Sequence, residues 1–271
     1  MSILNEILAY KKIEVAERKE FYPVELLERS IYFNVPAISL KKNLLRDDGT
    51  GVIAEIKRKS PSRGIINSDV SVERTSVGYL QAGASALSIL TDHHFFGGSN
   101  VDLTEARIFN RCPILRKDFI IEEYQIVEAK SIGADVILLI AAALNAKRLK
   151  ELCSFAHNIG LEVLLEVHNQ EELNNNLSAG ADLIGVNNRN LKTFELNIEI
   201  SKNLVELIPD SVVKVSESGI ESPEVIIELK RFGFRGFLLG QTFMQNRFPE
   251  NAAKDFIGKL RHLEAKFLEK K

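Results

Sequence analysis

Eight apolar strand-like runs alternate with eight amphipathic helix-like runs in this sequence, an order that predicts an α/β protein of the (β/α)8 barrel, or TIM-barrel, class. Two further observations favour it. Glycines that end helices recur at intervals of roughly 50 residues, which suits two strand–helix units, and a length of 271 residues suits one barrel. An open doubly wound sheet is the alternative fold, and the eightfold count disfavours it.

The strands are placed by four glycines, each of which follows a helix-like stretch and precedes an apolar run: Gly83, Gly133, Gly180 and Gly233. Glycine is common at the C′ position, where a helix ends in the left-handed conformation. These glycines mark four strands, and the apolar runs between them give four more. The eight expected strands are 52–57, 86–91, 113–117, 135–141, 162–167, 182–187, 212–217 and 236–240.

A helix is expected after each strand, because apolar residues recur there at i, i+3 and i+4. The clearest start is Ser222-Pro223-Glu224, a capping side chain followed by proline at the first helical position. Parallel strands joined by right-handed crossovers follow from this order. The expected helices are 71–82, 101–110, 122–132, 146–159, 170–179, 198–207, 223–232 and 250–268.

Residues 1–47 fall outside the eight units. We expect them to form an N-terminal helical extension packed on a barrel of residues 48–271, the whole being a single domain. The extension could cap the barrel floor or fold over its mouth, and the sequence leaves this open. A third helix is expected around 40–45, after two amphipathic helices indicated by Ile3, Leu4, Ile7, Leu8, Val24, Leu26 and Leu27.

Composition excludes several classes of protein. A net charge of -2 does not suit a nucleic-acid binder, and the apolar run 136–144 is far shorter than the roughly 20 residues that span a bilayer. The first residues lack the basic-then-apolar order of a signal peptide. Cys112 and Cys153 lack metal-binding spacing and are expected to be small buried hydrophobes. We therefore expect a cytoplasmic protein without metal, nucleic-acid or membrane partners, and histidines with ordinary packing or surface roles.

Charged residues at the strand ends are the main functional signal. Glu55 and Lys57 lie two residues apart, so a strand directs both side chains to one face. Unpaired buried charge costs several kcal/mol, so its repeated placement at strand ends indicates a shared polar site. A structural ion-pair network that plugs the barrel is the alternative. The other candidates at or just after strand ends are Lys117, Glu166, Asn187, Arg189, Glu217 and Ser218.

Each residue type suggests a role. A lysine such as Lys117 can be a general acid, an electrostatic anchor or a Schiff-base former, and Glu166 can shuttle protons if burial raises its pKa. Asn187 can donate to and accept from a substrate hydroxyl. Arg189 can bind a carboxylate through two parallel hydrogen bonds.

The loops after the seventh and eighth strands predict a phosphate site. Ser218-Gly219-Ile220 follows one strand, and Gly240-Gln241-Thr242 follows the other and opens a short helix-like piece, 241–245. Glycine allows backbone N–H groups to approach an anion, and a helix N-terminus adds its positive dipole end. Barrels often bind phosphate at this place. A polar loop from Ser60 to Asp69 could close over the ligand.

These segments resemble the indole-3-glycerol phosphate synthase family. The motifs are Ala54-Glu55-Ile56-Lys57-Arg58-Lys59-Ser60-Pro61-Ser62, Leu90-Thr91-Asp92 with Phe96-Gly97-Gly98-Ser99, Leu115-Arg116-Lys117-Asp118-Phe119, Leu165-Glu166-Val167, Gly185-Val186-Asn187-Asn188-Arg189-Asn190-Leu191 and Ser216-Glu217-Ser218-Gly219-Ile220. The resemblance covers nearly the whole chain. It implies a cofactor-free lyase of tryptophan biosynthesis that converts 1-(2-carboxyphenylamino)-1-deoxy-D-ribulose 5-phosphate to indole-3-glycerol phosphate, carbon dioxide and water. It leaves the oligomeric state open, and a monomer is compatible with it.

The resemblance also implies roles for these residues. Lys117 would protonate the ketone oxygen, with Glu166 as partner acid or base near Asn187. Glu55 and Lys57 would serve dehydration and the substrate's charges, and family accounts differ on which is the acid. The substrate would be held by Ser60 and Arg189 near the anthranilate carboxylate, by Glu217, and at the phosphate by Ser218, Gly219, Gly240 and Gln241.

Two rival functions remain. A sugar-phosphate aldolase would use Lys57 or Lys117 as a Schiff-base former. A catalytically silent barrel would act as a ligand-binding or scaffold subunit, although the full set of acids and bases at the strand ends disfavours it.

Overall fold

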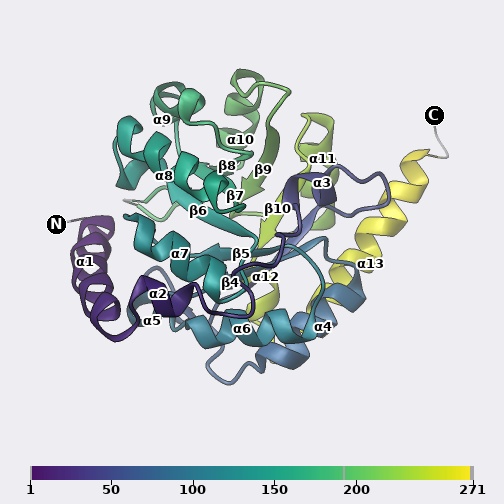
Figure 1. The fold of residues 1–271 in the computed structure, drawn as a ribbon. Coiled ribbons are helices and arrows are strands. Elements are labelled where there is room, and N and C mark those ends of the chain that lie inside the picture. The colour runs from purple at the N-terminus through teal and green to yellow at the C-terminus, as the bar shows by residue number, and fades with distance from the viewer. Residues whose placement is uncertain (1, 192, 269–271) are drawn as a thin grey trace.

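The computed structural model describes residues 2–191 and 193–268. Eight parallel strands form a closed barrel in the order β1-β10-β9-β8-β7-β6-β5-β4 (Figure 1). The barrel prediction is confirmed, with every strand bound within one residue of expectation; residues 269–271 of the expected barrel region lie outside the described residues. The strands are β1 (Val52–Ile56), β4 (Ala86–Leu90), β5 (Ile114–Lys117), β6 (Val136–Ile140), β7 (Glu162–Val167), β8 (Leu183–Asn187), β9 (Val213–Glu217) and β10 (Gly236–Leu239).

The helices surround the barrel as the periodicity predicts. Gly83, Gly133, Gly180 and Gly233 all have positive φ, between 87° and 106°, as expected where a helix ends before a strand. Two predicted helices finish in short 3-10 turns, η2 (Leu177–Ala179) and η3 (Val205–Leu207), and η1 (Ala141–Ala143) follows β6. The outer helices are α4 (Val72–Ala82), α6 (Asn100–Phe109), α7 (Glu123–Ser131), α8 (Ala146–Asn158), α9 (Gln170–Asn176), α10 (Glu199–Leu204), α11 (Pro223–Arg231) and α13 (Pro249–Leu268).

Three small elements lie at the strand ends. The polar loop after β1 contains an antiparallel pair, β2 (Lys59–Ser60) and β3 (Gly64–Ile65), where the sequence indicated only a loop. After β4 comes a one-turn helix, α5 (His93–Phe96), and after β10 comes α12 (Gln241–Met244), which confirms the helix-like piece expected there.

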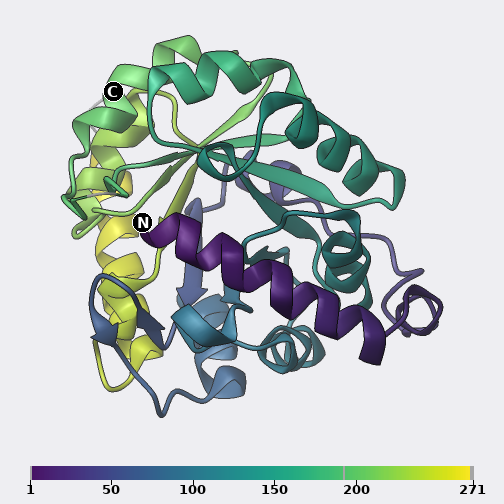
Figure 2. The same cartoon turned by 90° about the vertical axis from the view of Figure 1, so that its left-hand side faces the viewer.

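The N-terminal extension reaches both ends of the barrel. It comprises α1 (Ile3–Phe21), α2 (Val24–Leu27) and α3 (Leu40–Leu44). Leu40 and Leu44 of α3 are buried in the same cluster as the apolar side chains inside the barrel, so α3 closes the floor. Helix α1, purple in Figure 2, crosses the opposite end, where Ile3, Leu4 and Ile7 line the cavity at the mouth. The extension thus both caps the barrel floor and covers its mouth, the two placements that the sequence left open.

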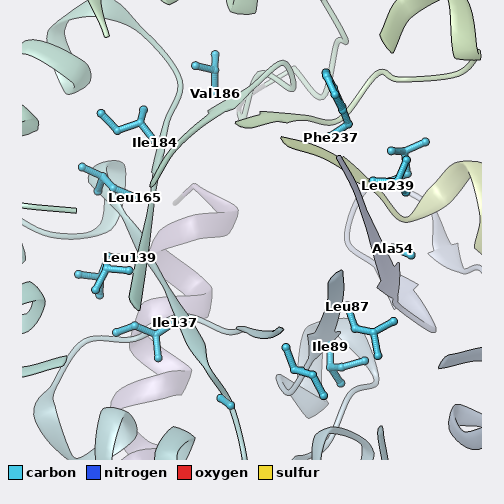
Figure 3. Close-up of a cluster of buried hydrophobic side chains, with 14 of the residues drawn as sticks. Ala54, Leu87, Ile89, Ile137, Leu139, Leu165, Ile184, Val186, Phe237 and Leu239 are labelled. Atoms are coloured by element: carbon cyan, nitrogen blue, oxygen red, sulfur yellow. The ribbon is translucent and has the colours of Figure 1, made fainter. Parts of the chain in front are cut away.

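The apolar core has two layers because strand side chains alternate between the faces of the sheet. One layer fills the space between strands and helices, and Figure 3 shows its side chains spread around the ring of strands, among them Ala54, Leu139 and Phe237. The other layer fills the barrel interior with residues such as Ile53, Leu115 and Leu164. Near the carboxyl ends of the strands the inward-facing positions include charged and polar residues, and these line the cavity at that end of the barrel.

Candidate active site

A cavity of about 550 Å³ opens at the carboxyl ends of the barrel strands. All twelve residues that the sequence proposed for the site line it: Glu55, Lys57, Ser60, Lys117, Glu166, Asn187, Arg189, Glu217, Ser218, Gly219, Gly240 and Gln241. Closure of the barrel therefore brings together residues that lie up to 186 positions apart in the chain. Their convergence is the geometry that a shared site requires.

Lys117 forms the centre of the charged cluster. Its Nζ lies 2.9 Å from Glu166 Oε2 and 2.5 Å from Glu217 Oε2. Burial alone would lower the pKa of Lys117, but the carboxylates of Glu166, Glu217 and Glu55 outweigh burial and raise it. Lys117 is therefore an ammonium at neutral pH. That state suits proton donation and disfavours the neutral amine that Schiff-base formation needs.

The two carboxylates beside Lys117 have opposite pKa shifts. Burial alone would raise the pKa of Glu166, but Lys117 and His168 outweigh burial and hold it well below its usual range. Burial raises the pKa of Glu217 to about 7, against the pull of Lys117 and with added repulsion from Glu166 and Glu55. Asn187 Nδ2 donates to Glu166 Oε1 at 3.2 Å, whereas Glu217 Oε1 accepts no hydrogen bond within the described residues. Different hydrogen bonds and neighbouring charges thus give Glu217 a higher affinity for a proton than Glu166 has.

Glu55 and Lys57 form a second acid–base pair. Glu55 is buried and its Oε1 lies 2.7 Å from Lys57 Nζ, while Ser88 Oγ donates to Oε2 at 3.4 Å. Gly240, on the neighbouring strand end, leaves room for the carboxylate, since an added Cβ would lie 2.4 Å from Glu55 Oε1. The lack of a side chain at Gly240 therefore serves Glu55 as well as the predicted anion site.

Asn187 and Arg189 continue from the end of β8 towards the cavity rim. The Arg189 backbone N–H donates to Asn187 Oδ1 at 3.0 Å, and its guanidinium donates to Phe194 O at 3.2 Å and Gln241 Oε1 at 3.5 Å. Burial, and then repulsion from Arg63, lowers the pKa of Arg189. The guanidinium groups of Arg63 and Arg189 thus lie near each other at the rim. Neither forms an ion pair with a carboxylate among the described residues, which favours an anionic ligand.

The two loops expected to bind phosphate meet at the same cavity. Ser218 and Gly219 have φ of 67° and 72°, so two consecutive residues adopt the left-handed conformation. For Ser218 this conformation is uncommon and typical of functional turns. Gly240 is the N-cap of α12 and Gln241 its first residue, which adds a short helix N-terminus to the turn.

The sequence did not identify the apolar wall of the cavity. Phe96 and Phe119 line it, with their ring centroids 5.8 Å apart. Neither is one of the charged strand-end residues from which the sequence predicted the site. Ile3, Leu4 and Ile7 of α1 also contribute. Aromatic residues next to the motif residues Gly97 and Asp118 were the available signal, but only the fold shows that α1 joins them.

His168 also differs from expectation, which gave it an ordinary packing or surface role. It is largely buried beside the cluster, with Nε2 3.2 Å from Glu166 Oε1 and Nδ1 3.1 Å from Glu172 Oε2. Burial alone would lower the pKa of His168, but the two carboxylates raise it to about 10. The signal in the sequence was its position, two residues after Glu166, where a strand continuing to alternate would turn it to the same side.

Other expectations concern the rest of the chain. Cys112 and Cys153 are free and buried, as expected. Across residues 2–191 and 193–268, no three His, Cys, Asp or Glu side chains are grouped so that they could hold a metal ion. No helix in the same ranges is both long and apolar enough to cross a membrane.

The fold and cavity together define the class of protein: a (β/α)8 barrel with a cavity, lined by buried acid and base groups, at the carboxyl ends of its strands. A family model described as indole-3-glycerol phosphate synthase matches residues 4–256. The chain belongs to the indole-3-glycerol phosphate synthase family, which confirms the resemblance carried by the strand-end motifs. It is accordingly a carboxy-lyase of tryptophan biosynthesis that acts on a phosphorylated small molecule.

Curated relatives of that name cover almost the whole chain. A Bacteroides thetaiotaomicron protein is 49% identical over 255 residues, 94% of this chain and 97% of the relative. A protein of Caldanaerobacter subterraneus subsp. tengcongensis is 42% identical over 261 residues, 96% and 99% of the two chains. A Campylobacter curvus protein is 40% identical over 256 residues, 93% and 98% of the two chains.

Solved structures with low sequence identity share the fold. A chain from the tryptophan synthase complex of Pyrococcus furiosus has a TM-score of 0.60 at 15% identity, covering 79% of this chain and 99% of its own. N-acetylmannosamine-6-phosphate 2-epimerase from Clostridium perfringens has a TM-score of 0.58 at 16% identity, covering 79% and 94%. These likenesses concern the barrel alone.

Proposed function

We propose that this cavity closes the indole ring of 1-(2-carboxyphenylamino)-1-deoxy-D-ribulose 5-phosphate, with Lys117 as the general acid. The observation that carries the proposal is the buried Lys117 ammonium, held between Glu166 and Glu217 in the cavity that the two glycine-containing turns also line. The substrate has a group that each part of the cavity can bind or act on: a ketone oxygen, an aromatic ring, a carboxylate and a phosphate. The products are indole-3-glycerol phosphate, carbon dioxide and water.

The first step is ring closure. The ring carbon that bears the carboxylate attacks the ketone carbon, so aromaticity is lost and negative charge builds on the ketone oxygen. Lys117 donates a proton to that oxygen, which stabilises charge where it develops. Loss of carbon dioxide then returns the electron pair to the ring. Lys117 then recovers a proton taken up from solvent, and Glu166, with Asn187 Nδ2 donating to its Oε1 at 3.2 Å, is placed to relay it.

The second step is loss of water. The hydroxyl group formed from the ketone must leave with a proton, while a proton on a neighbouring atom is removed to complete the indole double bonds. We assign this step to Lys57 and Glu55, a donor and an acceptor 2.7 Å apart at the carboxyl end of the first strand. Both side chains line the cavity, and Glu55 lies next to Gly240, near the place proposed for the sugar-phosphate portion of the substrate.

Binding groups complete the assignment. The turn at Ser218 and Gly219 and the start of α12 at Gly240 and Gln241 receive the phosphate through backbone N–H groups. Arg189, with Ser60 on the loop after β1, receives the anthranilate carboxylate. The substrate's hydroxyl groups can donate hydrogen bonds to Glu217, which lines the cavity. We further propose that the enzyme works in the cytoplasm, without nucleic-acid or membrane partners and without a cofactor, and that it can act as a monomer.

The test is indole formation, followed by fluorescence, from the synthetic substrate. We expect Lys117→Ala to lower turnover by about 10²–10⁴-fold, the usual contribution of general acid catalysis, without loss of the circular dichroism spectrum. Lys147→Ala, at an exposed position on α8, is the control and should match the wild type. Near-normal turnover by Lys117→Ala would refute Lys117 as the acid.

Borohydride separates the rival functions. Reduction in the presence of substrate traps a covalent adduct only if an amine has formed a Schiff base, so an adduct would favour an aldolase. A wild-type protein that binds the substrate without forming indole would instead be a silent ligand-binding barrel.

A further inference from the structure

Lys11 on α1 is a buried lysine that the reaction does not use. Its side chain is 1% exposed, and its Nζ lies 2.8 Å from Asp92 Oδ2, 2.9 Å from Asp118 Oδ1 and 2.7 Å from Glu14 Oε2. Asp92 and Asp118 are themselves buried. Burying these charges is costly unless they pair closely, and an apolar residue would fill the same space without that cost.

The partners of Lys11 lie beside the aromatic wall of the cavity. Asp92 is the N-cap of α5, where its Oδ1 accepts from the backbone N–H of Phe95 at 2.7 Å, and α5 ends at Phe96. Asp118 lies directly between Lys117 and Phe119 in the chain. One ammonium group therefore joins the two turns that carry the cavity's tilted aromatic pair, Phe96 and Phe119.

The helix that carries Lys11 supplies the remaining wall. Residues three, four, seven or eight apart share a helix face, so Ile3, Leu4 and Ile7 lie on the same side of α1 as Lys11. All three line the cavity. The path of α1 across the mouth is visible in Figure 2.

The other end of α1 is attached independently. Arg18 Nε lies 2.6 Å from Glu128 Oε1, and Tyr124 Oη donates to the carbonyl groups of Arg18 and Tyr22 at 3.0 and 2.9 Å. Lys19 adds an exposed ion pair with Glu122. Loss of Lys11 would therefore free the cavity half of α1 while the far half stays docked on α7.

We propose that Lys11 is a positioning residue that clamps α1 against the turns of Phe96 and Phe119 and so shapes the apolar pocket for the substrate's aromatic ring. The proposal rests on the function proposed above. It assigns the ammonium group to substrate binding rather than to proton transfer, because Lys11 touches the wall and not the reacting atoms. Burial alone would lower the pKa of Lys11, but Asp118, Asp92 and Glu14 raise it, so the clamp stays charged at neutral pH.

The test compares Lys11→Met with Lys19→Met, the same replacement on the same helix at a position whose side chain is 47% exposed. Steady-state kinetics give KM and kcat, and calorimetry gives Kd for two ligands: the substrate analogue with its ketone reduced to an alcohol, and D-ribulose 5-phosphate, which lacks the ring. For Lys11→Met we expect KM and the Kd of the ring-bearing analogue to rise about 10–100-fold, with kcat and the Kd of ribulose phosphate within about threefold of wild type. Lys19→Met should match the wild type, and Lys11→Arg should recover part of the affinity.

Two outcomes would overturn the proposal: unchanged KM and Kd in Lys11→Met, or equal loss of affinity for both ligands, which indicates general disruption. Should Lys11→Met fail to fold, Asp92→Asn keeps the Oδ1 cap of α5 while removing one partner charge, and the same selective loss is expected of it. Wild-type turnover reports on the proposed function separately, because its absence would refute that function whatever Lys11 does.

Discussion

Glu166 and Glu217 contact the same ammonium group, yet their surroundings shift their pKa values in opposite directions. Glu166 also contacts Asn187 and His168, whereas Glu217 Oε1 accepts no hydrogen bond from the described residues. A second buried negative charge next to the first is unfavourable, so one carboxyl group of the pair keeps its affinity for a proton. The three groups therefore titrate as a coupled set, in which Lys117 and Glu166 are charged and Glu217 is the carboxyl group with the higher affinity for a proton.

This difference predicts an unusual pH dependence of stability. The pKa of Glu217 rises from 4.5 to about 7 on folding, so ionisation of Glu217 destabilises the folded state, and the cost grows as the pH rises through that interval. We expect Glu217→Gln to raise the melting temperature at about pH 8 by about 2–8 °C, corresponding to roughly 1–2 kcal/mol, with the gain disappearing towards about pH 4.5. Calorimetric melting across the pH range measures it.

Glu166→Gln is the matched control, since it makes the same change on the other side of Lys117. The pKa of Glu166 is lowered on folding, so its ionisation stabilises the folded state above the pKa of an unfolded glutamate, and this contribution is lost as the pH falls. Glu166→Gln should therefore lower the melting temperature at about pH 8. Equal and parallel effects of the two replacements would contradict the assignment of their proton states.

At the residue scale, alternation along the strands predicted much of the site. The spacing of Glu55 and Lys57 was enough to place both inside the barrel, because a strand has a period of two. The pairing of Lys117 with Glu166 and Glu217 was not predictable in the same way, since those contacts span 49 and 100 residues and depend on barrel closure. The left-handed conformation of Ser218 has no signal in its residue type.

At the element scale, the N-terminal extension shows what periodicity leaves open. Helices α1 and α3 both have apolar positions, but only the structure shows that α1 covers the mouth and α3 the floor. The pair β2–β3 was missed because strands of two residues are too short to show alternation. Gly64, with φ of 67°, is the first residue of β3 and pairs with Ser60.

The floor position of α3 predicts a variant that affects stability alone. Leu44 is buried against the start of β10, where an added Cβ on Gly236 would lie 2.9 Å from Leu44 Cδ1. We expect Leu44→Ala to reduce the free energy of unfolding by about 2–5 kcal/mol, the usual cost of a buried leucine, with KM unchanged. Urea denaturation measures the first quantity and initial rates the second.

Leu45→Ala is the neighbouring control, because Leu45 is 50% exposed and should cost little. A raised KM in Leu44→Ala at a temperature where it stays folded would indicate that the floor communicates with the mouth, contrary to the placement of α3.

At the scale of the whole molecule, one barrel end holds the charged cavity and the other end is closed by apolar packing. Glycines at helix ends and apolar strands were sufficient to predict eight units and their order, because each is a local signal. The apolar wall formed by α1, Phe96 and Phe119 was not predictable, since it joins segments whose proximity depends on how an extension outside the repeat packs. The separation of stability at the floor from binding at the mouth is typical of this barrel class.

The most direct test of the account is a crystal structure of the protein with the ketone-reduced substrate analogue. We expect the hydroxyl oxygen that replaces the ketone within hydrogen-bonding distance of Lys117 Nζ, the phosphate between Ser218-Gly219 and Gly240-Gln241, and the aromatic ring against Phe96 and Phe119. An analogue bound with its phosphate beside Lys117, or bound outside this cavity, would contradict the central claim.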